Sequence, residues 1–183
     1  MNIQNKQESS QYIQKLQLNR FCETIFYSGE RQKVEEFLKE NTALLYVIRN
    51  KKEIGGKQYI DITAEEVLKH IDEFEIGAVD ISFNNYEKQK VLIGDIYLTK
   101  SGELYLHAST NKKSVHRQML EPIYNLKTTI YDYKLKSIPG MELIVNYLYK
   151  YALMEVIVEF GVFSEPIGIN KEPVVIFELR NQY

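Results

Sequence analysis

Carboxylates on the last two predicted strands come closest to a catalytic pattern in this sequence. Glu159 lies in a strand predicted over 154–163, and Glu178 shares one face of a strand predicted over 174–180 with Arg180, because residues two apart point to the same side of a strand. Paired carboxylates can hold a divalent cation that activates water. With Asp80 or Asp95 as a partner, they predict a small metal-dependent nuclease or hydrolase. Ion pairs across exposed strands, worth roughly 0.2–1 kcal/mol each, explain Glu159 and Arg180 without catalysis.

The histidines and the single cysteine do not form a metal site or a triad pattern. His70, His107 and His116 lie far apart in the chain, whereas zinc ligands usually come in pairs two to five residues apart. Cys22 falls on the apolar stripe of a predicted helix, so we expect a buried and unreactive thiol. We therefore expect no metal, no other cofactor and no catalytic residue of this kind.

The glycine pair Gly55-Gly56, followed by Lys57, is the only candidate for a phosphate-binding loop. A P-loop needs a further glycine five residues before the Gly-Lys pair and a serine or threonine after the lysine. Lys51 and Gln58 occupy those positions. This stretch therefore predicts a hairpin turn that leads into a strand over 59–62.

A basic segment heads the helix predicted over 114–126. Lys112, Lys113 and Arg117 lie there, with tyrosines downstream. Lysines and arginines can contact phosphates while aromatic rings stack on bases, so a nucleic-acid-binding regulator is one interpretation. The sequence has no helix-turn-helix glycine turn, RNA-binding aromatic signature or zinc finger, and the ordinary alternative is a solvated start of a helix.

An acidic segment surrounds another predicted helix. Residues 61–80 carry seven acids and one base, and the apolar positions of the helix are taken up by the core. The remaining positions predict a negative face that could dock on a basic protein surface. Its residues are Asp61, Glu65, Glu66, Asp72, Glu73 and Glu75. The ordinary alternative is again a solvated helix.

The elements that would position these residues predict an α+β fold over residues 1–183. Period-two alternation of apolar and polar residues, with short turns between runs, predicts a mainly antiparallel sheet of about seven strands with helices packed on it. Thr63 and Glu66 form a capping box that starts one of the helices. We expect one domain, with a helical N-terminal segment over 1–42, including a helix over 8–28, and a sheet-containing body over 43–183.

Bulk composition is that of a globular protein of the cytoplasm. Apolar residues make up 44% and charged residues 26% of 183 residues, and the net charge is −2, all ordinary values. One cysteine allows no internal disulfide, which fits a reducing compartment. The N-terminus resembles no signal peptide, and no apolar run is long enough to cross a bilayer. We expect a cytoplasmic protein of bacterium or host without a membrane partner.

Together these observations favour a non-enzymatic protein-binding inhibitor or regulator. The expected partner is a basic protein surface, such as a bacterial nucleic-acid enzyme. The composition suggests a gene from a phage or mobile element, which would make the chain an inhibitor of the anti-CRISPR kind. Nucleic acid is a second candidate partner through residues 112–136, and exposed tyrosines and isoleucines could support a homodimer.

Overall fold

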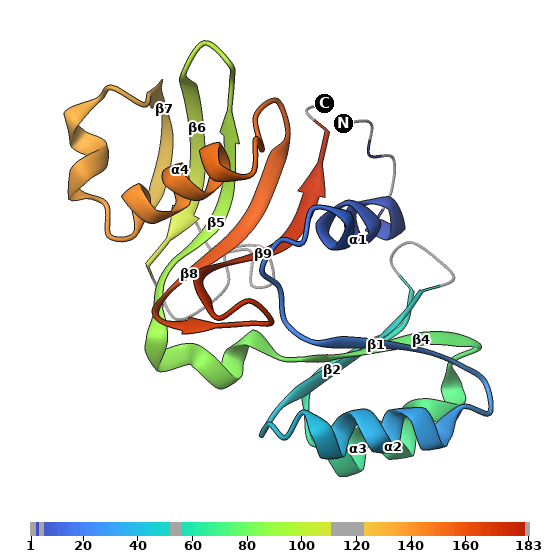
Figure 1. Cartoon of the computed structure of the whole chain (residues 1–183). Coiled ribbons are helices and arrows are strands. Elements are labelled where there is room, and N and C mark those ends of the chain that lie inside the picture. The colour runs from blue at the N-terminus through green and yellow to red at the C-terminus, as the bar shows by residue number, and fades with distance from the viewer. Residues whose placement is uncertain (1–2, 4–5, 52–55, 111–122, 182–183) are drawn as a thin grey trace. The chain divides into compact units, whose positions relative to one another are not determined.

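The computed structural model describes residue 3 and the ranges 6–51, 56–110 and 123–181. The chain forms two compact units (Figure 1). The larger unit combines Met1–Arg20 with Lys88–Tyr183, and the smaller unit is Phe21–Glu87. The smaller unit is therefore inserted between two parts of the larger one.

The larger unit is built on a five-stranded antiparallel sheet. Its strand order is β7-β6-β5-β8-β9. The strands are β5 (Lys90–Leu98), β6 (Glu103–Ser109), β7 (Tyr124–Thr129), β8 (Ile157–Ile167) and β9 (Glu172–Arg180). The helices of this unit are α1 (Lys6–Lys15), the short η3 (Tyr133–Ser137) and α4 (Met141–Lys150).

One face of this sheet forms the core of the larger unit, and α1 and α4 cover it (Figure 1). Leu92, Ile96 and Leu98 of β5 pack there against Ile144 and Leu148 of α4, all of them buried. Since strand side chains alternate between faces, Ile93, Asp95 and Tyr97 of β5 point to the opposite face. That opposite face carries the polar residues described below.

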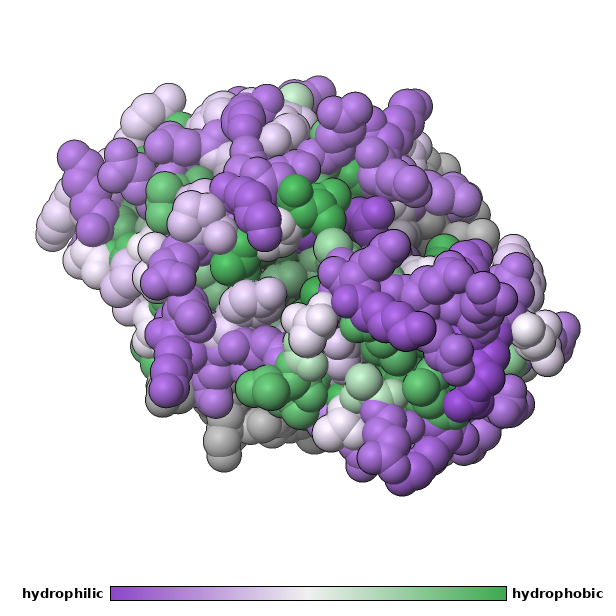
Figure 2. All heavy atoms as spheres, turned by 60° about the horizontal axis from the view of Figure 1, so that its bottom comes forward, coloured by the Kyte–Doolittle hydropathy of each residue, from purple (hydrophilic) through white to green (hydrophobic). Residues whose placement is uncertain are grey.

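The surface is mainly hydrophilic on the side shown in Figure 2, with hydrophobic side chains gathered in smaller areas. Among the described residues, no helix has the length and apolar character needed to cross a membrane.

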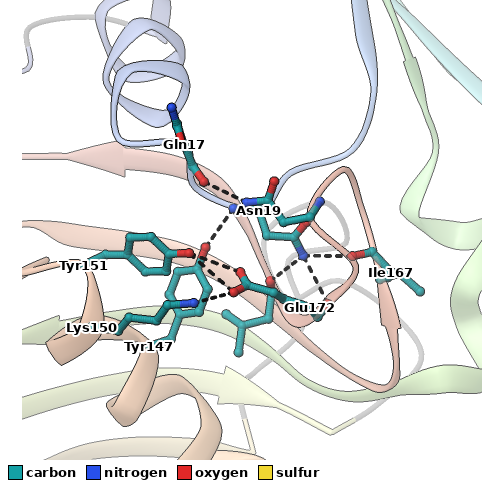
Figure 3. Close-up of polar contacts among 9 residues, drawn as sticks. Gln17, Asn19, Tyr147, Lys150, Tyr151, Ile167 and Glu172 are labelled. Carbon is teal, nitrogen blue, oxygen red and sulfur yellow. Dashed lines mark hydrogen bonds and ion pairs between the residues drawn. The ribbon is translucent and has the colours of Figure 1, made fainter.

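Asn19 fastens the segment after α1 to the β8–β9 hairpin (Figure 3). Its side chain is fully buried. The amide nitrogen Nδ2 donates to the main-chain oxygens of Ile167, Glu172 and Val174 at 2.9, 3.1 and 2.7 Å. Oδ1 accepts from the main-chain N–H of Asn170 at 2.9 Å. The main-chain N–H of Asn19 donates to the hydroxyl of Tyr147 on α4 at 2.8 Å, so one residue links three parts of the unit.

At Gly94 of β5, the backbone of β6 leaves no room for a side chain on the core side. A Cβ atom at this position would lie 2.2 Å from the main-chain oxygen of His107 and 2.5 Å from the Cα of Ala108. We expect Gly94→Val to lower the free energy of unfolding by about 3 kcal/mol or more, because the two strands must separate. Denaturant unfolding measures the loss.

Gly29 provides the control for this substitution. It has a φ of 88° and no neighbouring atom within 4 Å of an added Cβ, so Gly29→Ala should cost only the conformational penalty of about 1 kcal/mol. Equal losses in the two variants would contradict the role given to Gly94.

The smaller unit is built on a four-stranded antiparallel sheet of order β1-β4-β2-β3. Its elements are β1 (Glu23–Tyr27), α2 (Arg31–Glu40), β2 (Tyr46–Asn50), β3 (Gln58–Ile62), α3 (Ala64–His70), η1 (Ile71–Glu73) and β4 (Ile76–Ile81). η2 (Phe83–Gln89) leads back into the larger unit. The core of the smaller unit joins Val34 and Phe37 of α2 and Val67 of α3 to Phe26 and Ile48 of the sheet.

The sequence predicted the fold class correctly but not all of its elements. The protein is α+β with antiparallel sheets, as expected, but the described residues contain nine strands in two sheets rather than about seven in one. The helix predicted over 8–28 is wrong in its second half, because α1 ends at Lys15 and Glu23–Tyr27 pair with β4 as strand β1. The helix predicted over 114–126 falls mostly outside the described residues, and Tyr124 already belongs to β7. The single domain over 1–183 stays a prediction.

The capping box is confirmed in detail. The Thr63 hydroxyl accepts from the main-chain N–H of Glu66 at 3.3 Å, and the Glu66 carboxylate accepts from the main-chain N–H of Thr63 at 2.8 Å. These bonds satisfy donors at the helix start that have no partner within the helix. The capping box therefore determines where α3 begins.

Candidate functional site

A row of polar side chains crosses the five-stranded sheet on the face opposite its core. Asp95 of β5 lies in register with Glu159 of β8, and Glu159 lies in register with Glu178 of β9. In the other direction Asp95 faces His107 of β6, which faces Asn125 of β7. Neighbouring strands are about 4.8 Å apart, so these five residues form a continuous line, called here the polar row.

A β-bulge in β9 brings Glu178 into the polar row. Glu159 pairs with Glu178, but the next residue of β8, Phe160, pairs with Ile176. Phe177 is therefore an extra residue on β9, and such bulges change the direction in which strand side chains point. The bulge lets Ile176 and Leu179 pack in the core, while Glu178 joins the carboxylates on the opposite face.

Arg180 lies among the three carboxylates of the polar row. Its Nη2 contacts Oδ1 of Asp95 at 2.7 Å, and its Nε is 4.0 Å from Oε1 of Glu178. Burial lowers the pKa of the Arg180 guanidinium, but the negative charges of Asp95, Glu159 and Glu178 have the larger effect. The pKa is therefore raised. Arg180 therefore brings one permanent positive charge to three acidic groups.

An aromatic row runs beside the polar row on the same face. Tyr97 of β5 lies in register with Tyr105 of β6, which lies in register with Lys127 of β7. The two rings meet edge to face with centroids 5.8 Å apart, and the Lys127 ammonium lies 5.2 Å from the Tyr105 ring centroid. The Tyr97 hydroxyl donates to Glu155 at 3.2 Å. This face thus combines carboxylates, cations and aromatic rings within a few strands.

The polar row fits a cation that arrives with its own oxygen ligands better than a resident metal. Among the described residues, no three His, Cys, Asp or Glu side chains are placed to hold a metal ion together. Mg²⁺ bound with a nucleotide needs only one or two protein carboxylates, because phosphate oxygens and water complete its shell. Of the three acids in the polar row, Glu159 and Glu178 lie in register and are carboxylates of that number and kind, while Asp95 pairs with Arg180 at 2.7 Å.

The structure separates the two aspartates that the sequence offered as partners for the glutamates. Asp95 joins Glu159, Glu178 and Arg180 in the polar row, as predicted for one alternative. Asp80 lies in β4 of the smaller unit, where its partners belong to that unit. His107 and Asn125 complete the row, and sequence reasoning missed both as members of a site.

Asp80 belongs to a group of four charged residues on the smaller sheet. It forms an ion pair with Arg49 of β2, and it lies in register with Glu23 of β1, which pairs with Lys51 at 2.9 Å. Burial raises the pKa of Asp80 to about 6, with Arg49 opposing the rise and Glu23 adding to it. The pKa of Glu23 is lowered: burial raises it, but the attraction of Lys51 outweighs that effect. This group is called the buried ion cluster.

Most acids of the predicted negative face have partners within the smaller unit. Glu65 pairs with Lys69 at 3.0 Å, and Asp72 lies 3.8 Å from Arg31. Glu66 caps α3. A binding role for these residues stays a prediction, but their charge is balanced locally by neighbouring bases.

Glu73 and Asp61 are held by several groups each. Glu73 pairs with Lys57, contacts Nδ1 of His70 at 2.6 Å and accepts from the Tyr59 hydroxyl at 2.7 Å. The Lys57 hydrogen bond is the main cause that lowers the pKa of Glu73 to about 2. Asp61 accepts from Ser82 Oγ at 2.5 Å and from Asn84 Nδ2 at 2.7 Å. These contacts tie β3 to the segments that follow α3 and β4.

The other residues that the sequence singled out lie either outside the described residues or in the smaller unit. Lys112, Lys113 and Arg117, the candidates for nucleic-acid binding, lie outside the described residues. Glu75 directly precedes β4 and is exposed. His70 stacks on the Tyr59 ring with centroids 3.8 Å apart.

Comparison with known proteins identifies the fold class. No protein-family model matches the chain, and no curated protein matches it by sequence. Among solved structures, D-alanine-D-alanine ligase from Helicobacter pylori is similar at a TM-score of 0.52, with 12% identity over 96% of this chain and 53% of the ligase. The corresponding D-alanyl-alanine synthetase A from Vibrio cholerae gives 0.53, with 13% identity over 97% of this chain and 54% of the synthetase.

A third similar structure is the ADP complex of N5-carboxyaminoimidazole ribonucleotide synthetase. The TM-score is 0.53 with 13% identity, over 98% of this chain and 45% of the synthetase. The chain thus spans about half the length of these enzymes. At such low identities the likeness shows the fold alone, which is an ATP-grasp-like fold.

This fold overturns the function expected from the sequence. The similar structures are ligases and synthetases, so the prediction of a non-enzymatic inhibitor of the anti-CRISPR kind is wrong. The charge clustering that suggested it has a local explanation in the ion pairs of the smaller unit. The nuclease and nucleic-acid-regulator alternatives find no support in this fold either.

Proposed function

We propose that this chain binds an adenine nucleotide with Mg²⁺ at the polar row, as the nucleotide-binding part of a ligase or synthetase. The observation that carries the proposal is the in-register line of Asp95, Glu159 and Glu178 on the sheet face opposite the core. The fold is similar to that of a synthetase whose structure is an ADP complex, which favours ADP or ATP over other phosphate ligands.

The roles of the residues follow from their chemistry. Glu159 and Glu178 would contact the cation, which neutralises phosphate charge when it is bound. Lys127 and the aromatic row lie on the same face, where a positive charge and two rings suit an anionic and partly flat ligand. His107 and Asn125 add hydrogen-bonding groups along the row.

Nucleotide binding by variants of the polar row tests this proposal. We expect the chain to bind MgADP, measured by calorimetry. Glu159→Gln should weaken that binding by about tenfold, which corresponds to roughly 1.4 kcal/mol, because one carboxylate contact to the cation is lost. Binding of ADP with EDTA should be weaker than with Mg²⁺ and should change less in the variant.

The matched control is Glu142→Gln, the same chemical change at an exposed position of α4 on the core-covering side. It should leave the MgADP affinity unchanged. Absence of nucleotide binding by the native chain, or equal affinities of native protein and Glu159→Gln, would overturn the proposal.

A further inference from the structure

Arg180 is the feature of the polar row that the proposed function does not use. It comes from the same strand as Glu178, two residues on, and reaches across the sheet to Asp95 on β5. In the sheet, β8 lies between β5 and β9. The Arg180 side chain therefore crosses over β8 to reach Asp95. A fork-shaped, permanently charged group can contact two carboxylates at once.

The Nε atom of Arg180 shows that the guanidinium is held inside the site rather than extended into solvent. This atom is buried and makes no hydrogen bond, and Oε1 of Glu178 lies 4.0 Å from it. The side chain as a whole is 31% exposed. A cation that enters the row would meet this positive charge at short range, where like charges repel.

We infer that Arg180 is a positioning residue that acts as an internal cation of the polar row: it keeps free divalent cations out, so that Mg²⁺ is accepted only with a nucleotide. The second half of this inference rests on the proposed function, and the first half does not. A phosphate-bound cation carries its own negative charge into the site, which offsets the repulsion by the guanidinium. An isolated cation brings no such compensation.

Binding of Mn²⁺ alone tests the inference, measured on the full chain by the loss of the free-ion electron paramagnetic resonance signal. We expect Arg180→Gln to bind Mn²⁺ at least about tenfold more tightly than the native chain, because a positive charge next to the carboxylates is removed. The additional change Glu159→Gln should abolish the gain, which assigns the new affinity to the polar row.

Two further variants complete the test. Lys100→Gln removes the same charge from an exposed position after β5 in the same unit and should leave Mn²⁺ affinity unchanged. Arg180→Lys keeps the charge but cannot reach two carboxylates at once, so a smaller gain of about two- to fourfold is expected. If Arg180→Gln does not fold, the lysine variant decides: an Mn²⁺ affinity equal to that of the native chain overturns the inference.

The result is separable from that of the nucleotide experiment. Mn²⁺ is measured without nucleotide, so a chain that fails to bind MgADP can still show the gain in Arg180→Gln. A chain that binds MgADP but whose Arg180→Gln variant binds free Mn²⁺ no more tightly keeps the proposed function and loses this inference.

Discussion

Asn19→Leu is expected to lower the free energy of unfolding of the larger unit by about 3–4 kcal/mol, since each buried polar group left without a partner costs about 1–3 kcal/mol. The change removes the bonds from Nδ2 to the oxygens of Ile167, Glu172 and Val174. It also removes the acceptor of the Asn170 N–H. Leucine has a similar size but can neither donate nor accept, so these groups lose their partner inside the protein.

Hydrogen exchange measures this loss in the right place. Amides of β8 and β9 report on the larger unit alone, and we expect their protection to fall in Asn19→Leu. Asn146→Leu is the matched control, because Asn146 is exposed on α4 and surface changes of this kind stay within about 0.5 kcal/mol. A loss below 1 kcal/mol in Asn19→Leu would show that the hairpin does not depend on this side chain.

Arg49→Met should destabilise the smaller unit strongly and in a pH-dependent way. Removing one partner of a buried ion pair leaves an uncompensated charge inside the protein. Because Arg49 is partly exposed, we expect the free energy of unfolding to fall by about 2–4 kcal/mol at pH 8. Asp80, the partner, has only 13% of its side chain exposed. Methionine preserves much of the apolar stem of arginine, so the loss of charge dominates.

The sign of the pH dependence follows from the raised pKa of Asp80, about 6 instead of 3.8. A carboxyl whose folded pKa is raised favours folding most when it is protonated, and that contribution falls as the pH rises through 4 to 6. Arg49 opposes the rise in pKa, so its removal raises the pKa further. The cost of Arg49→Met should therefore be clearly smaller at pH 5 than at pH 8.

Urea unfolding at the two pH values, with Arg31→Met as control, checks this expectation. Arg31 pairs with Glu35 at 3.1 Å on the surface of α2 and is 46% exposed, so its replacement should cost little at either pH. The pKa of Glu23 is lowered, so its contribution to stability is lost as the pH falls, the opposite of Asp80. Glu23 is present in both the native chain and Arg49→Met. A cost of Arg49→Met that is independent of pH would contradict the arrangement of the buried ion cluster.

Local signals in the sequence predicted the parts of the fold that depend on neighbouring residues. The capping box at Thr63 and the alternation in β5 and β6 both involve contacts or faces set within a few residues. The helix predicted over 8–28 failed because its second half is determined by distant partners. Residues of β1 pair with β4, and Asn19 bonds to the β8–β9 hairpin more than 140 residues away.

The carboxylates of the candidate site could be named from the sequence, but His107, Asn125 and the assembly of the row could not. Alternation placed Glu159 and Glu178 on strand faces, and the sequence named Asp95 as a partner, but Asp80 looked equally suitable. The choice depends on strand order and register, which put β5 next to β8 and shift β9 by one bulge residue. The acidic segment over 61–80 predicted a negative face because the sequence alone does not show that Lys57 lies beside Glu73 and Arg31 beside Asp72.

The insertion of the smaller unit sets the order in which a growing chain can fold. All of Phe21–Glu87 precedes every strand of the five-stranded sheet in the chain, so it emerges from the ribosome before them and the smaller unit can assemble first. Helix α1 is synthesised before these elements, but the hydrogen bond from the Leu179 N–H of β9 to Ser9 of α1 can form only after β9 has been made. The apolar side of α1 must therefore stay exposed, or be shielded by a chaperone, until nearly the whole stretch has been translated.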